Sequence, residues 1–242
     1  MNQQLLDQLV PAGVLRVGVN MANFLLVTGE TDNGDPDGVS PGIAKAMANK
    51  LGVPISYVPF VGPGEVADAA ADDVWDIANI AAEPERAKTI TFSPAYCEIQ
   101  ATYLLPPQSS FKNVQEVDSA DCRIAVKERA AYDLYLTDQL KNATLVRTPS
   151  IDDSFDVFVG RSLEALAGLR PKLIEQQKLL LGSRVLEESF TSVQQSIGCR
   201  PDRAVAAEFI ESFVKESIEN GLVESLIDKH GVTGRLSVAP VA

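Results

Sequence analysis

Histidine and cysteine, which supply many of the nucleophiles, general bases and metal ligands of proteins, are scarce in this sequence. His230 is the only histidine. It precedes Gly231 in a run that is typical of the end of a helix, so a Ser-His-Asp or Cys-His triad would have one poorly placed base. The cysteines are odd in number and lack CxxC spacing, which favours buried free thiols: they are Cys97, Cys122 and Cys199. We therefore expect no metal and no cofactor.

Charge also limits the function. The chain has 33 acidic and 21 basic side chains among 242 residues, and its formal net charge is −12. Its lysines and arginines are scattered, whereas nucleic acids and anionic membranes select basic clusters. No run approaches the roughly 20 apolar residues of a membrane-spanning helix. We therefore expect no nucleic-acid partner and no direct membrane insertion.

Strand-like and helix-like segments alternate in the first third of the chain. β-Branched residues predict three strands, at 14–19, 53–60 and 75–81. Between them lie a predicted helix with Ser40 as its N-cap and Gly52 as its stop, and a short helix over 65–72. This order predicts an α/β fold with doubly wound, mainly parallel sheets. Because ligands bind beyond the carboxyl ends of such strands, loops 20–29 and 82–88 are the candidate binding loops.

A second, smaller α/β unit follows. Its strands are predicted at 122–126, 144–147 and 163–167, and a helix is predicted at 132–140. Extended segments at 101–105 and 190–195 bracket this unit, and the remainder of the chain is helical. We therefore predict two lobes, the first discontinuous over residues 1–103 and 192–242 and the second inserted over residues 104–191.

Five segments, in order, resemble those of a known family. They are Leu15-Arg16-Val17-Gly18-Val19, Gly38-Val39-Ser40-Pro41-Gly42-Ile43-Ala44-Lys45-Ala46-Met47, Trp75-Asp76-Ile77-Ala78, Glu83-Pro84-Glu85-Arg86-Ala87-Lys88 and Ile90-Thr91-Phe92-Ser93-Pro94-Ala95-Tyr96. Together they resemble the bacterial extracellular solute-binding proteins of family 3, the amino-acid-type receptors of ABC transporters. The resemblance implies a type II periplasmic-binding-protein fold, with two lobes, two hinge crossovers and a cleft that closes on a small ligand.

The resemblance also implies a function. We expect a monomeric binding protein, not an enzyme, that captures a small carboxylate-bearing metabolite (an amino acid or an organic acid) and delivers it to the permease of an ABC transporter. Arg86 takes the position whose guanidinium clamps the ligand carboxylate, because a planar fork of donors matches a carboxylate. The alternative is a surface arginine paired with Glu83 or Glu85.

Other ligand contacts follow from the same resemblance. Asn23 and Phe24 match a region where the family places an aromatic wall, and the alternative for Phe24 is plain core packing. Asn79 and the backbone around Ala81 are expected to add hydrogen bonds. The contacts expected from the second lobe are Tyr132 and Arg170.

Two departures from the family pattern bear on the ligand. Ala81 and Ala82 stand where small serine or threonine ligands are expected. Segment 160–170 lacks the aspartate that usually pairs with an α-ammonium group, and since an unpaired buried ammonium is costly, this favours an anionic ligand. Arg170 would add positive charge, unless it is a solvated loop residue. The alternative acids for an ammonium group are Glu128, Asp133 and Asp156.

Two other functions share this fold. Cyclohexadienyl dehydratases act on carboxylated rings, and the conceivable acids for such an enzyme are Glu98, Glu128 and Glu164. A ligand-sensing module would use the same cleft. The first seven residues lack the charge and apolar run of a secretory leader. We expect a periplasmic protein if a leader was removed, as the resemblance implies, and a cytoplasmic one if Met1 is the native start, which the unpaired cysteines favour.

Overall fold

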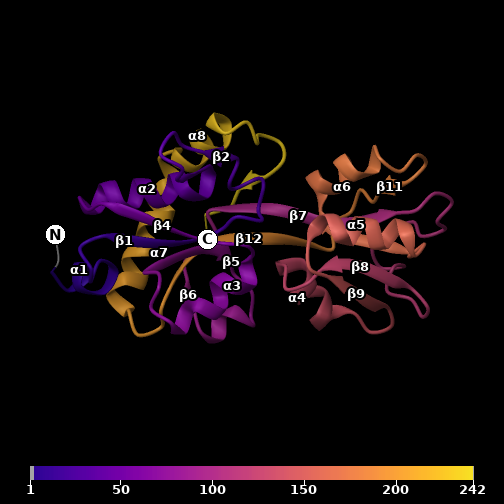
Figure 1. The fold of residues 1–242 in the computed structure, drawn as a ribbon, viewed down its shortest axis with the longest axis horizontal. Coiled ribbons are helices and arrows are strands. Elements are labelled where there is room, and N and C mark those ends of the chain that lie inside the picture. The colour runs from indigo at the N-terminus through magenta and orange to yellow at the C-terminus, as the bar shows by residue number, and fades with distance from the viewer. Residues whose placement is uncertain (1–2, 242) are drawn as a thin grey trace. The chain divides into compact units, whose positions relative to one another are not determined.

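The computed structural model describes residues 3–241, and the chain forms two compact units. Unit 1 comprises Met1–Glu98 and Gln194–Ala242, and unit 2 comprises Ile99–Val193. The chain passes from one unit to the other inside two long strands, β7 (Cys97–Leu105) and β12 (Thr191–Cys199), which are labelled in Figure 1. Unit 2 is therefore an insertion whose two connections to unit 1 are both strands.

Unit 1 is built on a parallel sheet. Strand β1 (Leu15–Asn20) lies between β4 (Ile55–Phe60) and β5 (Ile77–Ala81), and it pairs in parallel with both. On the far side of β5, β12 runs antiparallel to it. Because β1 and β5 are parallel neighbours, their carboxyl ends, Asn20 and Ala81, lie at the same edge of the sheet. The two candidate binding loops both leave from this edge.

Helices cover both faces of this sheet, so the predicted α/β class is confirmed. Helices α2 (Val39–Leu51) and α8 (Leu222–Lys229) lie on one side, and α3 (Pro63–Asp68), continued by the 3₁₀ turn η1 (Ala69–Ala71), lies on the other (Figure 1). The α3 side is packed with apolar side chains, namely Val66, Ala69, Ala70, Trp75, Ala78, Ile80 and Ile90. This core fixes the strands whose ends position the site.

The start of α2 differs from the prediction. Its N-cap is Gly38 rather than Ser40, and Ser40 lies buried inside the first turn. Gly38 has φ 154°, and a Cβ at this position would stand 2.2 Å from the carbonyl oxygen of Leu26. The Ser40 N–H donates to the same carbonyl at 3.1 Å. The close approach of the β1–α2 loop therefore requires glycine and makes the helix begin earlier than a serine cap predicts, whereas its predicted end at Gly52 is confirmed.

A buried ion cluster lies at the opposite edge of the unit 1 sheet. Asp76, just before β5, has a fully buried side chain. It accepts hydrogen bonds from Arg16 at the start of β1, from Nη2 at 2.8 Å and from Nε at 3.0 Å. Arg203, at the start of helix α7 (Ala204–Glu219), donates to the same carboxylate at 3.1 Å. The cluster joins β1, β5 and α7 far from the carboxyl ends of the strands, so we interpret it as structural.

Unit 2 repeats the α/β pattern. Parallel strands β8 (Arg123–Lys127), β9 (Thr144–Thr148) and β10 (Ala165–Leu169) form its sheet, and the first of them lies between the other two. The unit 2 part of β7 pairs antiparallel to β10. The helices that follow these strands are α4 (Ala131–Gln139) and α6 (Arg170–Gln177), and both contact β10. All three predicted strands are present, with β10 two residues later than expected.

Two helices of unit 2 are absent from our predictions, α6 and α5 (Ile151–Gly160). Helix α5 packs on β8 and β10, and its side chain Phe158 is buried. Its N-cap, Ser150, accepts a hydrogen bond from the N–H of Asp153 at 3.0 Å. A serine followed by acids before an apolar run is a start signal that the sequence contains and that our interpretation missed.

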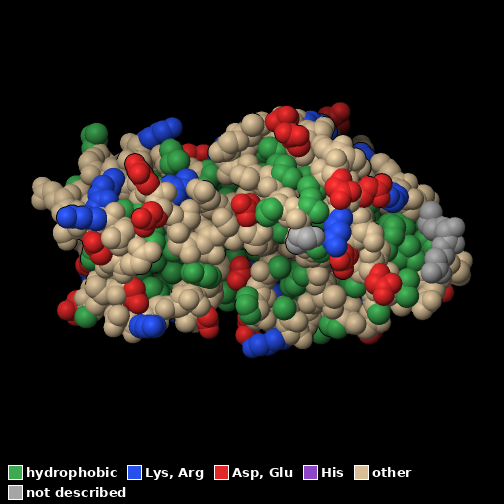
Figure 2. All heavy atoms as spheres, turned by 180° about the vertical axis from the view of Figure 1, so that it is seen from behind, with side chains coloured by type: hydrophobic (Ala, Val, Ile, Leu, Met, Phe, Trp, Pro, Cys, Tyr) green, Lys and Arg blue, Asp and Glu red, His purple; other side chains and the backbone are tan. Residues whose placement is uncertain are grey.

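Short elements complete the two units. They are α1 (Gln3–Leu9), the hairpin of β2 (Gly29–Glu30) and β3 (Pro36–Asp37), the 3₁₀ turn η2 (Arg86–Lys88), β6 (Thr91–Phe92), β11 (Arg184–Val185) and β13 (Ser237–Val238). All three cysteines are free and buried, as predicted. His230 caps α8 as its sequence context predicted. Acidic and basic side chains are interspersed over the face shown in Figure 2. Within residues 3–241, no helix has the length and apolar character needed to cross a membrane.

Candidate functional site

Arg86 lies one turn beyond the carboxyl end of β5. The main chain leaves the strand through Ala82, whose N–H donates to the carbonyl of Gln194 in β12 at 2.9 Å. It then turns, and the N–H of Ala87 donates to the carbonyl of Glu83 at 2.9 Å. This turn brings the Arg86 guanidinium back to β5, where Nη1 donates to the carbonyl of Ala81 at 2.9 Å.

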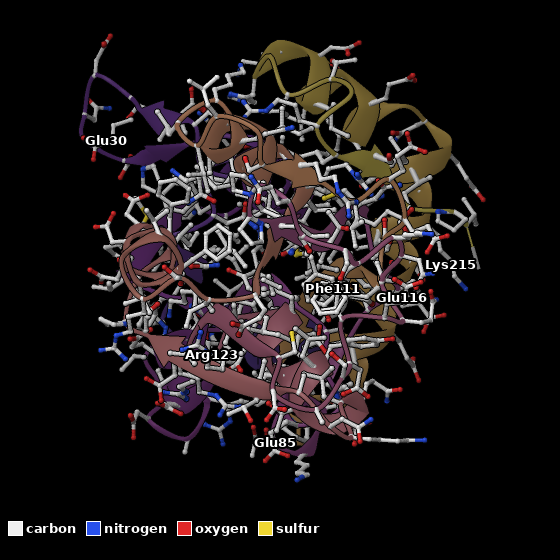
Figure 3. The ribbon with its side chains drawn as sticks, turned by 90° about the vertical axis from the view of Figure 1, so that its right-hand side faces the viewer. Glu30, Glu85, Phe111, Glu116, Arg123 and Lys215 are labelled. Carbon is white, nitrogen blue, oxygen red and sulfur yellow. The ribbon has the colours of Figure 1, made fainter. Side chains whose placement is uncertain are left out.

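Arg86 is buried, with 4% of its surface exposed. The alternative is a surface arginine paired with Glu83 or Glu85. Arg86 is not at the surface, and Glu85 is exposed and forms its ion pair with Lys88, whereas Glu83 does interact electrostatically with Arg86. Figure 3 shows the Glu85 side chain at the periphery of the molecule. A buried guanidinium that a main-chain carbonyl holds in place, at the ligand edge of a parallel sheet, is chemically suited to bind a carboxylate.

Glu83 shares the turn with Arg86. Its side chain is half-buried. Burial raises the pKa of the Glu83 carboxyl from 4.5 to about 7, and the nearby charge of Arg86 opposes this rise without cancelling it. Among the carboxyls of the described chain whose pKa clearly departs from its ordinary value, Glu83 is the one with a raised pKa. Our sequence interpretation considered Glu83 only as a partner for Arg86.

Asn23 and Phe24 lie in the loop that leaves β1. The buried Asn23 side chain accepts a hydrogen bond from the N–H of Leu25 at 3.2 Å. The main-chain carbonyl of Asn23 accepts one from the N–H of Leu26 at 3.0 Å. Asn23 therefore shapes the loop. Phe24 is half-buried, and the guanidinium carbon of Arg235 lies 5.5 Å from its ring centroid. Phe24 is thus not sealed in the core, and it is placed at the ligand edge of the sheet.

Asn79 and Ala81 point to the same side of β5, two residues apart. Asn79 is buried, and its Nδ2 donates to the carbonyl of Ser40 at 2.7 Å, which ties β5 to the first turn of α2. Asn79 Oδ1 is buried and has no hydrogen-bond partner among the described residues. Ala81 contributes a carbonyl to Arg86, as described above. These residues support the site's backbone, and direct contact with a ligand stays a prediction.

Tyr132 and Arg170 belong to unit 2. Tyr132 is buried in the first turn of α4, and burial raises the pKa of its hydroxyl. Arg170 opens α6, and its guanidinium donates to Gln100 Oε1 at 2.6 Å, to the carbonyl of Leu186 at 2.8 Å and to that of Glu187 at 2.6 Å. Arg170 thus joins β7, α6 and the segment before β12, so it is not merely a solvated loop residue. Its predicted role as a ligand contact is not supported by these bonds and stays a prediction.

The other acids that the sequence analysis named are either hydrogen-bonded within the chain or exposed. Asp133 is buried and accepts hydrogen bonds from Arg147 Nε at 2.9 Å and from the N–H of Arg129 at 2.7 Å. Glu164 accepts from Arg123, which lowers the pKa of the Glu164 carboxyl. Glu98 accepts from Gln194 Nε2 at 2.7 Å. Two further acids, Glu128 and Asp156, are exposed.

Comparison with known proteins identifies the family. The family model of the bacterial extracellular solute-binding proteins, family 3, matches residues 15–233. This match extends over both units, and it agrees with the resemblance noted in the five sequence segments. No curated protein matches the chain.

Solved structures with the same fold include amino-acid-binding proteins. A mutant of ArgBP from T. maritima is 20% identical with TM-score 0.73, and the match covers 94% of this chain and 99% of that chain. The amino acid ABC transporter substrate-binding protein AbpA from Streptococcus pneumoniae, bound to L-arginine, is 17% identical with TM-score 0.73 and coverage of 92% and 96%. The ancestral amino acid-binding protein AncCDT-1, a precursor of cyclohexadienyl dehydratase, is 21% identical with TM-score 0.74 and coverage of 93% and 97%. At these identities the likeness shows the fold, which is the predicted type II periplasmic-binding-protein fold.

Proposed function

The chain belongs to the bacterial extracellular solute-binding proteins, family 3, and on this premise we propose that it captures a small carboxylate-bearing metabolite, an amino acid or an organic acid, for an ABC-type transporter. The observation that carries the proposal is the buried guanidinium of Arg86 at the carboxyl edge of the unit 1 sheet. The solved neighbours bound to amino acids support the ligand class.

The physical basis is electrostatic. A guanidinium presents donors in a rigid plane, and its hydrogen bond to the Ala81 carbonyl restricts that plane before any ligand arrives. Restricted donors lose less entropy on binding than flexible ones. In a site with little water, the attraction between the guanidinium and a ligand carboxylate is stronger than on an exposed surface. Arg86 is therefore suited to act as a preorganised anchor.

The second part of the proposal concerns the two units. We assign them as the two lobes of the binding protein, with β7 and β12 as the hinge. Unit 2 would add its own contacts from the carboxyl ends of β8 and β10, where α4 and α6 begin. The partner would be the permease of an ABC transporter, the protein would act as a monomer, and its place would be outside the cytoplasmic membrane.

The enzyme alternative finds little support among its own candidate acids. A general acid needs a raised pKa, whereas the pKa of Glu164 is lowered, Glu128 is exposed, and Glu98 is paired with Gln194. The relationship of one neighbour to cyclohexadienyl dehydratase still makes the direct test worthwhile. Incubation with prephenate or arogenate should leave both compounds unchanged.

A thermal-shift screen of amino acids and organic acids tests the proposed function. A ligand that binds only the folded state raises the melting temperature by mass action, and a concentration of one hundred times Kd stabilises by about 2.7 kcal/mol. We expect compounds with a carboxylate to raise Tm and their amides to have no effect. A screen in which no carboxylate at millimolar concentration raises Tm would contradict the proposal.

A further inference from the structure

Glu83 and Arg86 are opposite charges on one turn, and their pairing has a consequence for the ligand. We propose that the Glu83 carboxylate binds the ammonium group of the ligand, so that Glu83 and Arg86 together select a zwitterionic α-amino acid over the matching carboxylate without the amine. This inference rests on the proposed function, because Arg86 must hold the ligand carboxylate. It makes Glu83 a specificity-determining residue in place of the aspartate that the family resemblance leads us to expect in segment 160–170.

The geometry of the turn suits a zwitterion. The hydrogen bond from the Ala87 N–H to the Glu83 carbonyl, at 2.9 Å, closes one turn that contains both side chains. The Arg86 guanidinium is drawn back to the carbonyl of Ala81, two residues before Glu83. The ammonium and carboxylate of an α-amino acid are bonded to the same carbon, so their protein partners must also lie close together. An anion and a cation on one turn meet this requirement.

The Glu83 carboxylate also has hydrogen-bonding capacity to offer. It is half-buried, and no described residue donates a hydrogen bond to it. A carboxylate that loses water without gaining donors is unfavourable, which is the reason that burial raises its pKa. An ammonium group brings a positive charge and three donors. Its binding would offset the desolvation of the Glu83 carboxylate.

The neighbouring acids are engaged elsewhere or exposed. Glu85 is paired with Lys88 at the surface, and Glu98, on β7, accepts from Gln194. Arg86, in η2, is thus the charged group whose field lowers the pKa of Glu83. From β12, the carbonyl of Gln194 accepts a hydrogen bond from the N–H of Ala82. In unit 2, the alternative acid Asp133 is held by Arg147. Glu83 is therefore the acid in the described chain that is best placed for an ammonium group beside Arg86.

Proton linkage predicts the direction in which ligand affinity changes with pH. Since the pKa of Glu83 is raised to about 7, some of the Glu83 carboxyls are protonated near neutral pH in the free protein. An ammonium ligand binds the ionised form, so binding should release protons, and affinity should rise with pH through this range. A protonated Glu83 that donated to the ligand carboxylate would instead take up a proton on binding, and affinity would fall.

The experiment is calorimetric titration of the intact protein with matched pairs: L-glutamate and glutarate, L-alanine and propionate, and L-arginine and 5-guanidinopentanoate. Each pair is titrated into the wild type, Glu83→Gln and the control Glu85→Gln, in two pH 7 buffers of different ionisation enthalpy, which reveals the protons released. We expect the wild type and Glu85→Gln to bind the amino acid of at least one pair about tenfold or more tightly than its partner, with proton release. Glu83→Gln should lose both the preference and the proton release.

Other outcomes overturn one or both proposals. Equal affinity for both members of a pair, proton uptake on binding, or a preference that survives in Glu83→Gln would overturn the role of Glu83 and leave the carboxylate anchor intact. If the ligands that bind the wild type bound Arg86→Ala with unchanged affinity, or if no ligand of any pair bound the wild type, both proposals would fail. Near-ultraviolet circular dichroism of Glu83→Gln establishes that the variant is folded.

Discussion

At the scale of single residues, the site depends on where the Arg86 charge is buried. A cation that is only 4% exposed must be compensated, and the Ala81 carbonyl contributes one such contact. A ligand carboxylate would add a full negative charge. The affinity of the site should therefore depend more on Arg86 than on the exposed charges of the same turn.

Replacing Arg86 by alanine should weaken binding of the ligand found in the thermal-shift screen by about 2–5 kcal/mol, since one member of a desolvated charge pair is removed. Lys88→Ala is the matched control, because Lys88 belongs to the same 3₁₀ turn and is exposed. Calorimetric titration measures both variants, and Arg86→Lys shows whether charge without the planar fork suffices. Equal affinity in the wild type and a folded Arg86→Ala would remove Arg86 from the site.

Stability should depend on pH through Glu83. Its pKa is about 7 in the folded protein and near 4.5 when exposed, so the folded state favours the protonated form. The stabilisation from this proton is complete below pH 4.5 and is lost as pH rises through 7. Urea unfolding at several pH values should show that Glu83→Gln flattens this loss between those limits. The same pH profile in Glu83→Gln and the wild type would exclude a buried, proton-binding Glu83.

The residues of the candidate site differ in how far the sequence predicts them. Arg86 is proposed from the sequence because its segment follows a recognisable strand and matches a family pattern, and its role as a ligand contact stays a prediction. Glu83 was not proposed as a ligand contact, because its burial and its raised pKa are not visible in spacing. The internal hydrogen bonds of Asn23 and Arg170 also emerge only from the folded chain.

At the scale of elements, the loop between β1 and α2 is held by the close contact at Gly38. A Cβ there would stand 2.2 Å from the Leu26 carbonyl oxygen, so the loop that carries Asn23 and Phe24 would have to move. Gly38→Ala should therefore destabilise the protein by at least about 2 kcal/mol and also weaken ligand binding. Gly34→Ala is the control, because nothing lies within 4 Å of its added Cβ, and its positive φ should cost only roughly 1 kcal/mol. Equal unfolding free energies for the two variants would contradict this account.

The ion cluster at the opposite edge should matter for stability and not for binding. Asp76→Asn removes the buried carboxylate charge that Arg16 and Arg203 share. This should lower the free energy of unfolding by about 3–5 kcal/mol, although Arg203 keeps its ion pair with the exposed Asp73. Asp72→Asn, an exposed acid four residues earlier, should change it by less than about 0.5 kcal/mol. Urea unfolding measures both. A ligand affinity that fell in folded Asp76→Asn would show that the two edges of the sheet are coupled.

The elements show why the fold was largely predictable from sequence. The unit 1 strands contain β-branched residues that indicate a strand, and Gly52 ends α2 in the left-handed conformation. The start of α2 was wrong because Ser40 is buried by a loop contact that no local signal reveals. Helix α5 was missed although Ser150 caps it and acids follow in its first turn, which is a local start signal.

At the scale of the whole molecule, two units are joined only by strands that belong to both. Each unit has its own parallel strands and its own apolar core cluster, and the chain crosses at Glu98–Ile99 in β7 and at Val193–Gln194 in β12. Two connections allow rotation about one axis while limiting other motions. A two-unit protein of this kind can exist in open and closed forms, and a ligand shifts that equilibrium by the contacts that it makes only in one of them.

The last prediction follows from this connection of the units. If Arg86 anchors the ligand in unit 1 and unit 2 adds contacts of its own, a saturating ligand must favour the form in which both sets are made, because only that form gains the extra binding energy. Small-angle scattering should then show a smaller radius of gyration with ligand than without it. The control is Arg86→Ala at the same ligand concentration, which should keep the radius of the free protein because its site stays empty. A wild-type radius of gyration that does not change at saturation, established by calorimetry on the same sample, would mean that the ligand binds one unit alone and that β7 and β12 do not act as a hinge.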